Sequence, residues 1–283
     1  MLSVDADWQA WLTTNSNRGC SAQSMIDAMV KAGFDAVVAR AAVQGLAGRD
    51  AGVQAEPAQG KPREFQYDGC PVAGGNLIHA HDRAVNVLAR LERPQVIVFG
   101  DVLSPQECAE MIERSRHRLT RSTTVNPETG QEDIIRNRTS EGVWFQREED
   151  AFIARLEQRI ASLMNWPVEN GEGLQILHYN RGGEYRPHFD YFPPDQAGSA
   201  VHTAHGGQRV ATLIVYLNDV PRGGETVFPE AGLSVAARQG HAVYFRYMNR
   251  VRQLDPLTLH AGAPVEAGDK WIMTKWVRER EYV

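Results

Sequence analysis

The amino-acid sequence predicts an α+β protein, mainly β with flanking helices, that is preceded by a small helical N-terminal domain. Short apolar runs separated by glycine and proline occupy the chain after Gly171, a pattern typical of an antiparallel sandwich or barrel. Two longer stretches ahead of these runs have helical periodicity. The N-terminal segment is also periodic, and it contains no cluster of ligand or nucleophile residues.

The composition is that of a globular protein. The chain has 283 residues, of which 42% are hydrophobic and 23% charged, so a disordered or collagen-like protein is excluded. A formal net charge of -5 argues against a nucleic-acid partner. The 30 basic residues include only four lysines, Lys31, Lys61, Lys270 and Lys275. This arginine bias, together with the abundant alanine and glycine, indicates a bacterial source.

Neither a membrane span nor a signal peptide is predicted. No apolar run approaches the roughly 20 residues that cross a bilayer, and the N-terminal segment MLSVDADWQAW lacks the basic and apolar regions of a signal peptide. We therefore expect a cytoplasmic protein without a membrane partner. The cysteines Cys20, Cys70 and Cys108 are odd in number and widely spaced, which argues against a disulfide framework or a structural zinc site.

Three short helices are predicted near the N-terminus. Trp8, Trp11 and Leu12 follow helical spacing in the first, and Gly33 ends the second. Residues 47–75 are rich in glycine, alanine, proline and glutamine, which is typical of a linker. The expected organisation is a helical module at 1–46, this linker, and a larger domain at 76–283.

The larger domain is expected to begin with two strands and to contain two helices. Residues 85–91 and 95–103 are the predicted strands, and Ser104-Pro105 is the predicted start of a helix because proline suits the first helical turn. A second helix is predicted over 150–164, and the polar stretch 120–138 between the helices is expected to be a functional loop. The later predicted strands are LQILHYN, RVATLIVYLNDV, HAVYFRY and DKWIMTKWV.

A candidate metal site lies among these later strands. His188 and Asp190 form an HxD triplet, and side chains at i and i+2 of a strand share one face. An imidazole and a carboxylate together supply two ligands of a facial triad for non-haem Fe(II). The third ligand needs a distant histidine, and His260 lies in LDPLTLHAGAP with Lys270 ten residues later.

Three segments resemble the catalytic core of the prolyl 4-hydroxylases, which are Fe(II)/2-oxoglutarate-dependent dioxygenases. The resemblance covers roughly residues 95–280 and implies a double-stranded β-helix (jelly-roll) core. It also implies that His188, Asp190 and His260 bind iron and form the catalytic centre. The segments are LHYNRGGEYRPHFDYF, HGGQRVATLIVYLNDVPRGGETVFP and LDPLTLHAGAPVEAGDKWIMTKWV.

The resemblance places 2-oxoglutarate beside the metal. Its remote carboxylate needs a cation, and Lys270 can provide a charge-assisted hydrogen bond. Tyr179 and Thr226 would supply hydroxyl groups around the same co-substrate. Trp276 has the strand parity of Lys270 and would face the same interior.

The implied reaction is oxidative decarboxylation of 2-oxoglutarate with O2, giving succinate and CO2, coupled to hydroxylation of an unactivated C–H bond. Asp190 favours hydroxylation, since halogenating relatives have a small residue in its place. Ascorbate is a possible further requirement, to reduce oxidised iron, on which the sequence is silent.

By the same resemblance, a peptide substrate would lie under the loop 120–137, which leads into an Arg-x-Ser strand. Family members often carry a histidine shortly after the final tryptophan, where this chain has Arg278. We expect Arg278 to place a cation near the groove and to select an anionic group or a different peptide. The residues expected around the substrate are Arg138, Ser140, Glu172, Tyr185, Arg209 and Trp276.

The function expected from the sequence is hydroxylation of a prolyl residue in a peptide or protein. The nearest alternative is the same chemistry on a free amino acid, a non-prolyl residue or a natural-product peptide. The alternative from another class is a non-catalytic jelly-roll binding module. The sequence does not predict the oligomeric state or the role of the N-terminal helices.

Overall fold

The computed structural model describes residues 4–17, 22–47, 64–125, 132–133, 139–196 and 198–283. The chain forms two compact units, Met1–Phe65 and Gln66–Val283. Of the predicted linker 47–75, residues 48–63 lie outside the described part. Ala47 is the last residue of a helix, and residues 64–75 contain neither helix nor strand. Among the described residues, no helix combines the length and the apolar character needed to cross a membrane.

The N-terminal unit contains three helices, as the sequence predicts. Its core is aromatic, because the Trp8 ring packs edge-on against Trp11 and Phe34 at centroid distances of 5.1 and 4.9 Å. Gly33, with φ of 93°, follows the second helix in the left-handed conformation that stops a helix. The helices are α1 (Ala6–Asn17), α2 (Ala22–Lys31) and α3 (Ala36–Ala47).

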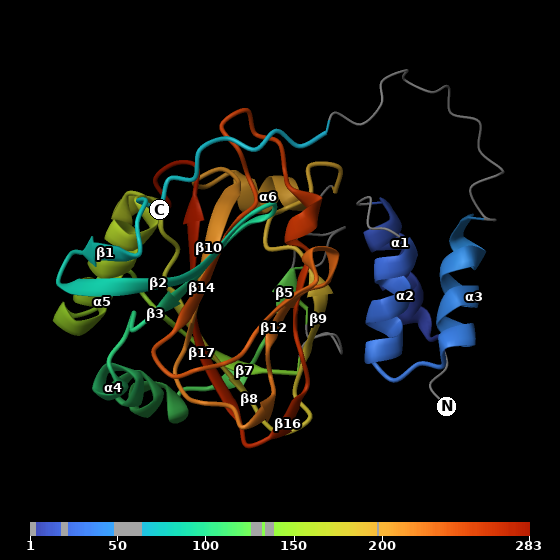
Figure 1. Cartoon of the computed structure of the whole chain (residues 1–283), viewed down its shortest axis with the longest axis horizontal. Helices are drawn as coiled ribbons and strands as arrows, with labels where there is room; N and C mark the ends of the chain where they lie inside the picture. The colour runs from blue at the N-terminus through green and yellow to red at the C-terminus, as the bar shows by residue number, and fades with distance from the viewer. Residues whose placement is uncertain (1–3, 18–21, 48–63, 126–131, 134–138, 197) are drawn as a thin grey trace. The chain divides into compact units, whose positions relative to one another are not determined.

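The second unit is built around a nine-stranded antiparallel sheet. Its strand order is β1-β2-β3-β14-β10-β17-β8-β7-β4, and in Figure 1 the helices α4 and α5 lie on one side of it. The strands are β1 (Leu77–Ala80), β2 (Arg83–Glu92), β3 (Gln95–Gly100), β4 (Thr120–Arg121), β7 (Glu141–Phe145), β8 (Leu174–Tyr179), β10 (Arg209–Tyr216), β14 (Ala242–Arg246) and β17 (Lys270–Arg278).

A four-stranded sheet in the order β13-β12-β15-β9 faces the other side of the large sheet, which is the arrangement of a jelly roll. Its strands are β9 (Tyr185–His188), β12 (Thr226–Phe228), β13 (Leu233–Val235) and β15 (His260–Gly262). Two further pairs are β11 (Arg222–Gly223) with β16 (Val265–Ala267), and β5 (Thr124–Val125) with β6 (Glu132–Asp133). The β5–β6 pair lies within the predicted loop 120–138, whose remaining residues 126–131 and 134–138 are outside the described part.

Three helices accompany the sheets: α4 (Pro105–Arg116), α5 (Ala151–Met164) and the short α6 (Ser199–Thr203). Ser104 caps α4 with a complete capping box, and Asp150 caps α5 by accepting from two backbone N–H groups. These caps explain why both long helices begin where the sequence predicts.

The two faces of strand β10 have different surroundings. Leu213 and Val215 are fully buried in the hydrophobic core with Leu156 and Ile160 of α5. Thr212, one position away, points to the opposite side and hydrogen-bonds across the jelly-roll interior. Because successive strand side chains alternate, one face of the sheet packs on helices while the other lines the interior.

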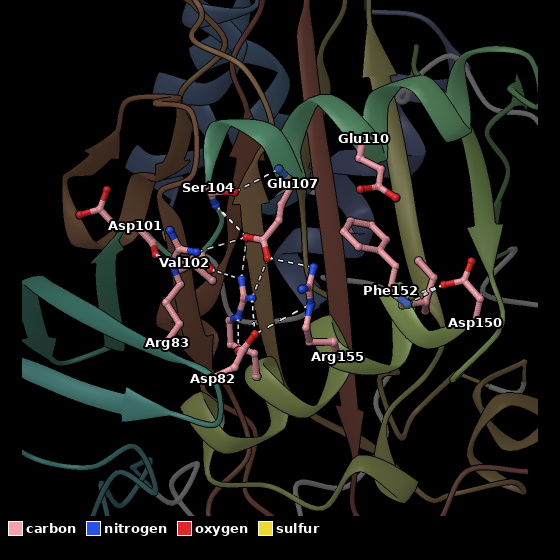
Figure 2. A network of polar contacts seen from close by, with 12 residues as sticks. Asp82, Arg83, Asp101, Val102, Ser104, Glu107, Glu110, Asp150, Phe152 and Arg155 are labelled. Atoms are coloured by element: carbon pink, nitrogen blue, oxygen red, sulfur yellow. Dashed lines mark hydrogen bonds and ion pairs between the residues drawn. The ribbon is translucent and has the colours of Figure 1, made fainter.

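A buried ion network joins α4, α5 and the turn after β1. Arg159 is 2% exposed and donates to both oxygens of Asp82 and both of Glu107 at 2.7–2.8 Å. Arg155, with a side chain 47% exposed, lies 3.4 Å from the Glu107 carboxylate. Figure 2 shows the labelled side chains of Asp82, Glu107 and Arg155 converging between the two helices. The helices are therefore tied by paired charges as well as by apolar packing.

Replacing Arg159 with methionine should lower the free energy of unfolding by about 3 kcal/mol, because it leaves two carboxylates without their buried partner. Arg155→Met is the matched control and should cost less than about 1 kcal/mol, since its ion pairs are exposed. Urea denaturation of both variants measures the difference. Equal costs would show that burial of Arg159 does not matter.

Candidate active site

The predicted metal ligands come together between the two sheets. His188 ends β9, Asp190 follows just after the strand, and His260 begins β15 opposite His188 in the β9–β15 pairing. One ligand atom from each lies within 4.8 Å of the other two. The Nε2 atoms of His188 and His260 are each 3.6 Å from an oxygen of Asp190. Asp190 therefore joins the cluster from the residues after the strand, although an HxD pair within one strand was expected.

The histidine rings are oriented by backbone carbonyls. His188 Nδ1 lies 2.9 Å from the carbonyl oxygen of Arg186, and His260 Nδ1 lies 3.0 Å from that of Thr258. A carbonyl can only accept a hydrogen bond, so Nδ1 carries the proton and Nε2 presents its lone pair toward Asp190. This is the arrangement that metal-binding histidines use.

A residue of the large sheet, Thr212 of β10, hydrogen-bonds the Asp190 carboxylate. Thr212 Oγ1 lies 2.7 Å from Asp190 Oδ2 and 3.2 Å from the Tyr247 hydroxyl. Thr212 has one hydroxyl proton, so it donates to Asp190 and accepts from Tyr247. Thr212 was not singled out from the sequence, although one polar residue inside the apolar run RVATLIVY is a usable signal.

The electrostatics favour an ionised Asp190 beside a neutral His260. Burial lowers the pKa of His260 to about 4, and repulsion from His188 adds to the effect. Burial alone would raise the pKa of Asp190, but the two histidines outweigh it and hold that pKa below its usual range. At neutral pH the cluster thus offers the neutral ring of His260 and an ionised carboxylate, toward which His188 Nε2 also points.

A buried cation lies in the same interior. Lys270 is 3% exposed, and its ammonium group makes no hydrogen bond to any residue that the structure describes. The nitrogen lies 5.6 and 5.9 Å from the ring centres of Tyr179 and Tyr216. Burial lowers the pKa of Lys270 to about 8, and Glu225 opposes the shift. A buried charge without a hydrogen-bond acceptor is unfavourable, which indicates that an anion belongs beside it.

Tyr179 and Thr226, which are also predicted to contact the co-substrate, lie near Lys270. Tyr179 is the direct neighbour of Lys270 in the β8–β17 pairing. Thr226 pairs with Gly262, and a Cβ on that glycine would lie 3.8 Å from the Lys270 nitrogen. The structure thus brings Tyr179, Thr226 and Lys270 close together.

Trp276 is on the same face of β17 as Lys270, but it contacts Arg209 and not the residues around Lys270. Its register partner is Thr212, and its ring centre lies 4.1 Å from the Arg209 guanidinium carbon. It lies six positions along the strand from Lys270, roughly 20 Å away. Its Nε1 is buried without a hydrogen-bond partner among the described residues. Trp144, 42% exposed and not predicted from the sequence, lies 5.7 Å from the Trp276 ring.

Glu172 and Arg209 form a buried ion cluster with Arg278. Arg209 binds both Glu172 oxygens at 2.6 and 2.8 Å, and Arg278 Nε donates to one of them at 2.6 Å. Arg278 also donates to the carbonyls of His202 and Gly207. The expectation that Arg278 offers a cation to the groove therefore finds no support, because its charge and donors are used internally.

Of the other residues predicted to contact the substrate, one lies beside His188, one is buried, and one is outside the described part. Tyr185 stacks on the His188 ring at 3.5 Å between centres. Ser140 is fully buried and hydrogen-bonds Ser122 at 2.9 Å. Arg138 lies outside the described residues.

Comparisons with known proteins agree with this geometry. Residues 174–278 match the model of the 2OG-Fe(II) oxygenase superfamily. Probable prolyl 4-hydroxylase 3 of Arabidopsis thaliana is 41% identical over 208 residues, which cover 67% of this chain and 71% of that protein. The chain belongs to the prolyl 4-hydroxylase family of 2OG-Fe(II) oxygenases.

Other members of the prolyl 4-hydroxylase family are also similar. The alpha-1 subunit of prolyl 4-hydroxylase from Rattus norvegicus is 37% identical over 189 residues, covering 67% of this chain and 35% of the subunit. The crystal structure of a viral collagen prolyl hydroxylase from Paramecium Bursaria Chlorella virus-1, in complex with 2OG, has a TM-score of 0.52 at 29% identity and covers 65% of this chain and 95% of that one. The jelly-roll prediction is confirmed, and the chain is a dioxygenase of a family that uses Fe(II), 2-oxoglutarate and O2.

Thr212→Val should weaken Fe(II) binding about tenfold, because partners of metal-bound carboxylates tune affinity by that order. Thr120→Val, at the β4 edge, is the matched control and should leave affinity unchanged. Anaerobic Fe(II) titration measures both dissociation constants. Equal affinities for Thr212→Val and the wild type would remove Thr212 from the metal site.

Proposed function

We propose that this protein hydroxylates a prolyl residue in a peptide or protein, using Fe(II), 2-oxoglutarate and O2 and releasing succinate and CO2. The observation that carries the proposal is a buried Lys270 ammonium, without a hydrogen-bond acceptor among the described residues, in the interior that also holds His188, Asp190 and His260. This combination provides a cation for a dicarboxylate and a donor set for iron. A structural role alone would leave the lysine charge uncompensated.

The donor set suits Fe(II). His188, His260 and Asp190 supply two imidazoles and one carboxylate, which is the donor set of the facial triads that hold non-haem Fe(II). When bound, the iron supplies the oxidation chemistry that protein side chains lack. The contribution of the chain is to orient the ligands and to exclude water from the interior.

Lys270 would hold the remote carboxylate of 2-oxoglutarate by a charge-assisted hydrogen bond. Thr226 is suited to help, because its oxygen already accepts from the Tyr216 hydroxyl at 2.7 Å. Its own proton is then available for an anionic acceptor. Tyr179 lies beside Lys270 on the neighbouring strand β8.

The substrate part of the proposal rests on the relatives and on an aromatic surface. Similar proteins are named prolyl 4-hydroxylases in Arabidopsis thaliana and Rattus norvegicus. The exposed Trp144 offers a ring for a proline side chain, and the buried Trp276 lies against it. Arg209 is fixed against Trp276 by Glu172, so this surface is preorganised. Tyr185 would border it beside His188, while Ser140 would support the strand.

The test measures succinate release under air with Fe(II) and 2-oxoglutarate, with and without proline-containing peptides. We expect peptide-stimulated succinate and a matching mass gain of one oxygen on a prolyl residue. Peptides in which alanine replaces proline are the control. Oxygen gain on a non-prolyl residue or a free amino acid would refute the prolyl assignment but keep the chemistry.

His188→Ala provides the control for the iron site and should reduce succinate release to background, because only two ligands remain. Retention of full turnover by this variant would refute the ligand assignment.

Lys270→Met should raise the KM for 2-oxoglutarate by roughly 10- to 100-fold, the scale of a lost charge-assisted hydrogen bond. Lys31→Met, which removes a lysine from α2 in the N-terminal unit, is the control and should leave this KM unchanged. Steady-state succinate release at varied 2-oxoglutarate measures both. An unchanged KM for Lys270→Met would place the co-substrate elsewhere.

The affinity for 2-oxoglutarate should fall above about pH 8. Burial lowers the pKa of Lys270 to about 8, so the ammonium is charged below that pH and loses its proton above it. The groups facing it are Tyr179, Tyr216 and Glu225. Binding measured from pH 6.5 to 9.5 should be level at first and then weaken by about tenfold per pH unit. A level profile through pH 9.5 would contradict a neutralised lysine.

A further inference from the structure

Residues 66–68, called the arm below, connect the linker to the dioxygenase unit and are fastened to one loop. The backbone N–H of Gln66 donates to Gln253 Oε1 at 3.0 Å, and its carbonyl accepts from Asn249 at 2.9 Å. The Asp68 carboxylate accepts from the backbone N–H of Arg250 at 2.9 Å. The arm therefore binds the segment 247–258, called the ligand loop below.

Both ends of the ligand loop support proposed metal ligands. At its beginning, the Tyr247 hydroxyl bonds to Thr212, which donates to Asp190. At its end, the Thr258 carbonyl accepts from His260 Nδ1 at 3.0 Å. The two ends are joined by the Asp255 N–H, which donates to the Tyr247 carbonyl at 2.8 Å.

Tyr67 connects the arm to the end that supports His260. Its hydroxyl lies 2.8 Å from Asp255 Oδ2, and Asp255 is fully buried. The other oxygen of Asp255 accepts from the Leu257 N–H at 3.0 Å. Its carbonyl accepts from Thr258 Oγ1 at 2.6 Å. A continuous series of hydrogen bonds thus runs from Tyr67 through Asp255 and Thr258 to the His260 ring.

This series of hydrogen bonds can affect the orientation of the His260 ring. Each member is buried or half-buried, where hydrogen bonds are stronger and reinforce one another. Removing the Tyr67 hydroxyl leaves one buried oxygen of Asp255 without its partner, so Asp255 and the turn to Thr258 must readjust. The Thr258 carbonyl sets both the tautomer and the tilt of the His260 ring, and such outer partners typically change metal affinity by about 10–100-fold.

We propose that Tyr67 is a positioning residue of the metal site, acting through Asp255 and Thr258 on the imidazole of His260. The inference rests on the proposed role of His260 as an iron ligand. It gives the arm a role in the site although the arm precedes every strand of the dioxygenase unit. The contacts of Gln66 and Asp68 fasten the same loop but do not lead to His260 among the residues that the structure describes.

The first test uses Co(II), an air-stable substitute for Fe(II), and the full chain. Tyr67→Phe should raise the Co(II) dissociation constant about tenfold, the lower end of the range for outer partners, and should shift the visible Co(II) bands. Tyr282→Phe is the matched control, since the Tyr282 hydroxyl makes no hydrogen bond to the described residues. It should bind Co(II) as the wild type does. The melting temperatures of the metal-free proteins separate lost positioning from lost fold.

The second test examines the intermediate step. Thr258→Val removes the hydroxyl that binds the Asp255 carbonyl and should weaken Co(II) binding as Tyr67→Phe does, whereas Thr258→Ser should retain affinity. Because both changes interrupt one series, the double variant Tyr67→Phe/Thr258→Val should lose less than the product of the single losses.

The outcomes distinguish the inference from the proposed function. Wild-type affinity and bands in Tyr67→Phe, or a lower melting temperature with unchanged affinity, would overturn the positioning role while the metal site stands. A wild-type protein that binds no Co(II), or a His260→Ala variant that binds it equally well, would overturn both.

Discussion

The carboxylate of Asp190 is the interaction on which the site depends, because three separate elements must meet around it. One of its oxygens accepts from Thr212 of the large sheet, and the Nε2 atoms of His188 and His260, from the small sheet, lie 3.6 Å away. A buried carboxylate is costly unless it is paired. The jelly roll must therefore keep β9, β10 and β15 in one relative register for the charge to be tolerated.

Many of the interactions that stabilise this arrangement of strands lie outside the interior between the two sheets. Helix α5 packs on the outer face of the large sheet, where Leu156 and Ile160 are fully buried. Its Glu157 receives the ammonium of Lys275 at 2.5 Å, and Arg159 links it to α4. The two buried lysines of β17 thus differ, because Lys275 donates to a carboxylate of the protein while Lys270 has no hydrogen-bond acceptor among the described residues.

Much of the fold could be predicted because it follows from local chemistry. The apolar runs, the Ser104 and Asp150 caps and the HxD triplet each depend on a few neighbouring residues. What could not be predicted are contacts that depend on tertiary structure. The sequence shows Arg278 as a cation after Trp276, but its neutralisation by Glu172, about a hundred residues earlier, requires the closed sheet. Thr212 acquires its role only when β9 lies opposite β10.

The alternation along β17 has a consequence for the register of this strand. Lys270 and Trp276 occupy one face of this strand, while Lys275 occupies the other. Shifting a strand by one residue turns every side chain to the other side of its sheet. A one-residue shift of β17 would turn Lys275 toward the interior between the two sheets and Lys270 toward α5. The register of β17 against its two neighbouring strands therefore determines which lysine faces that interior.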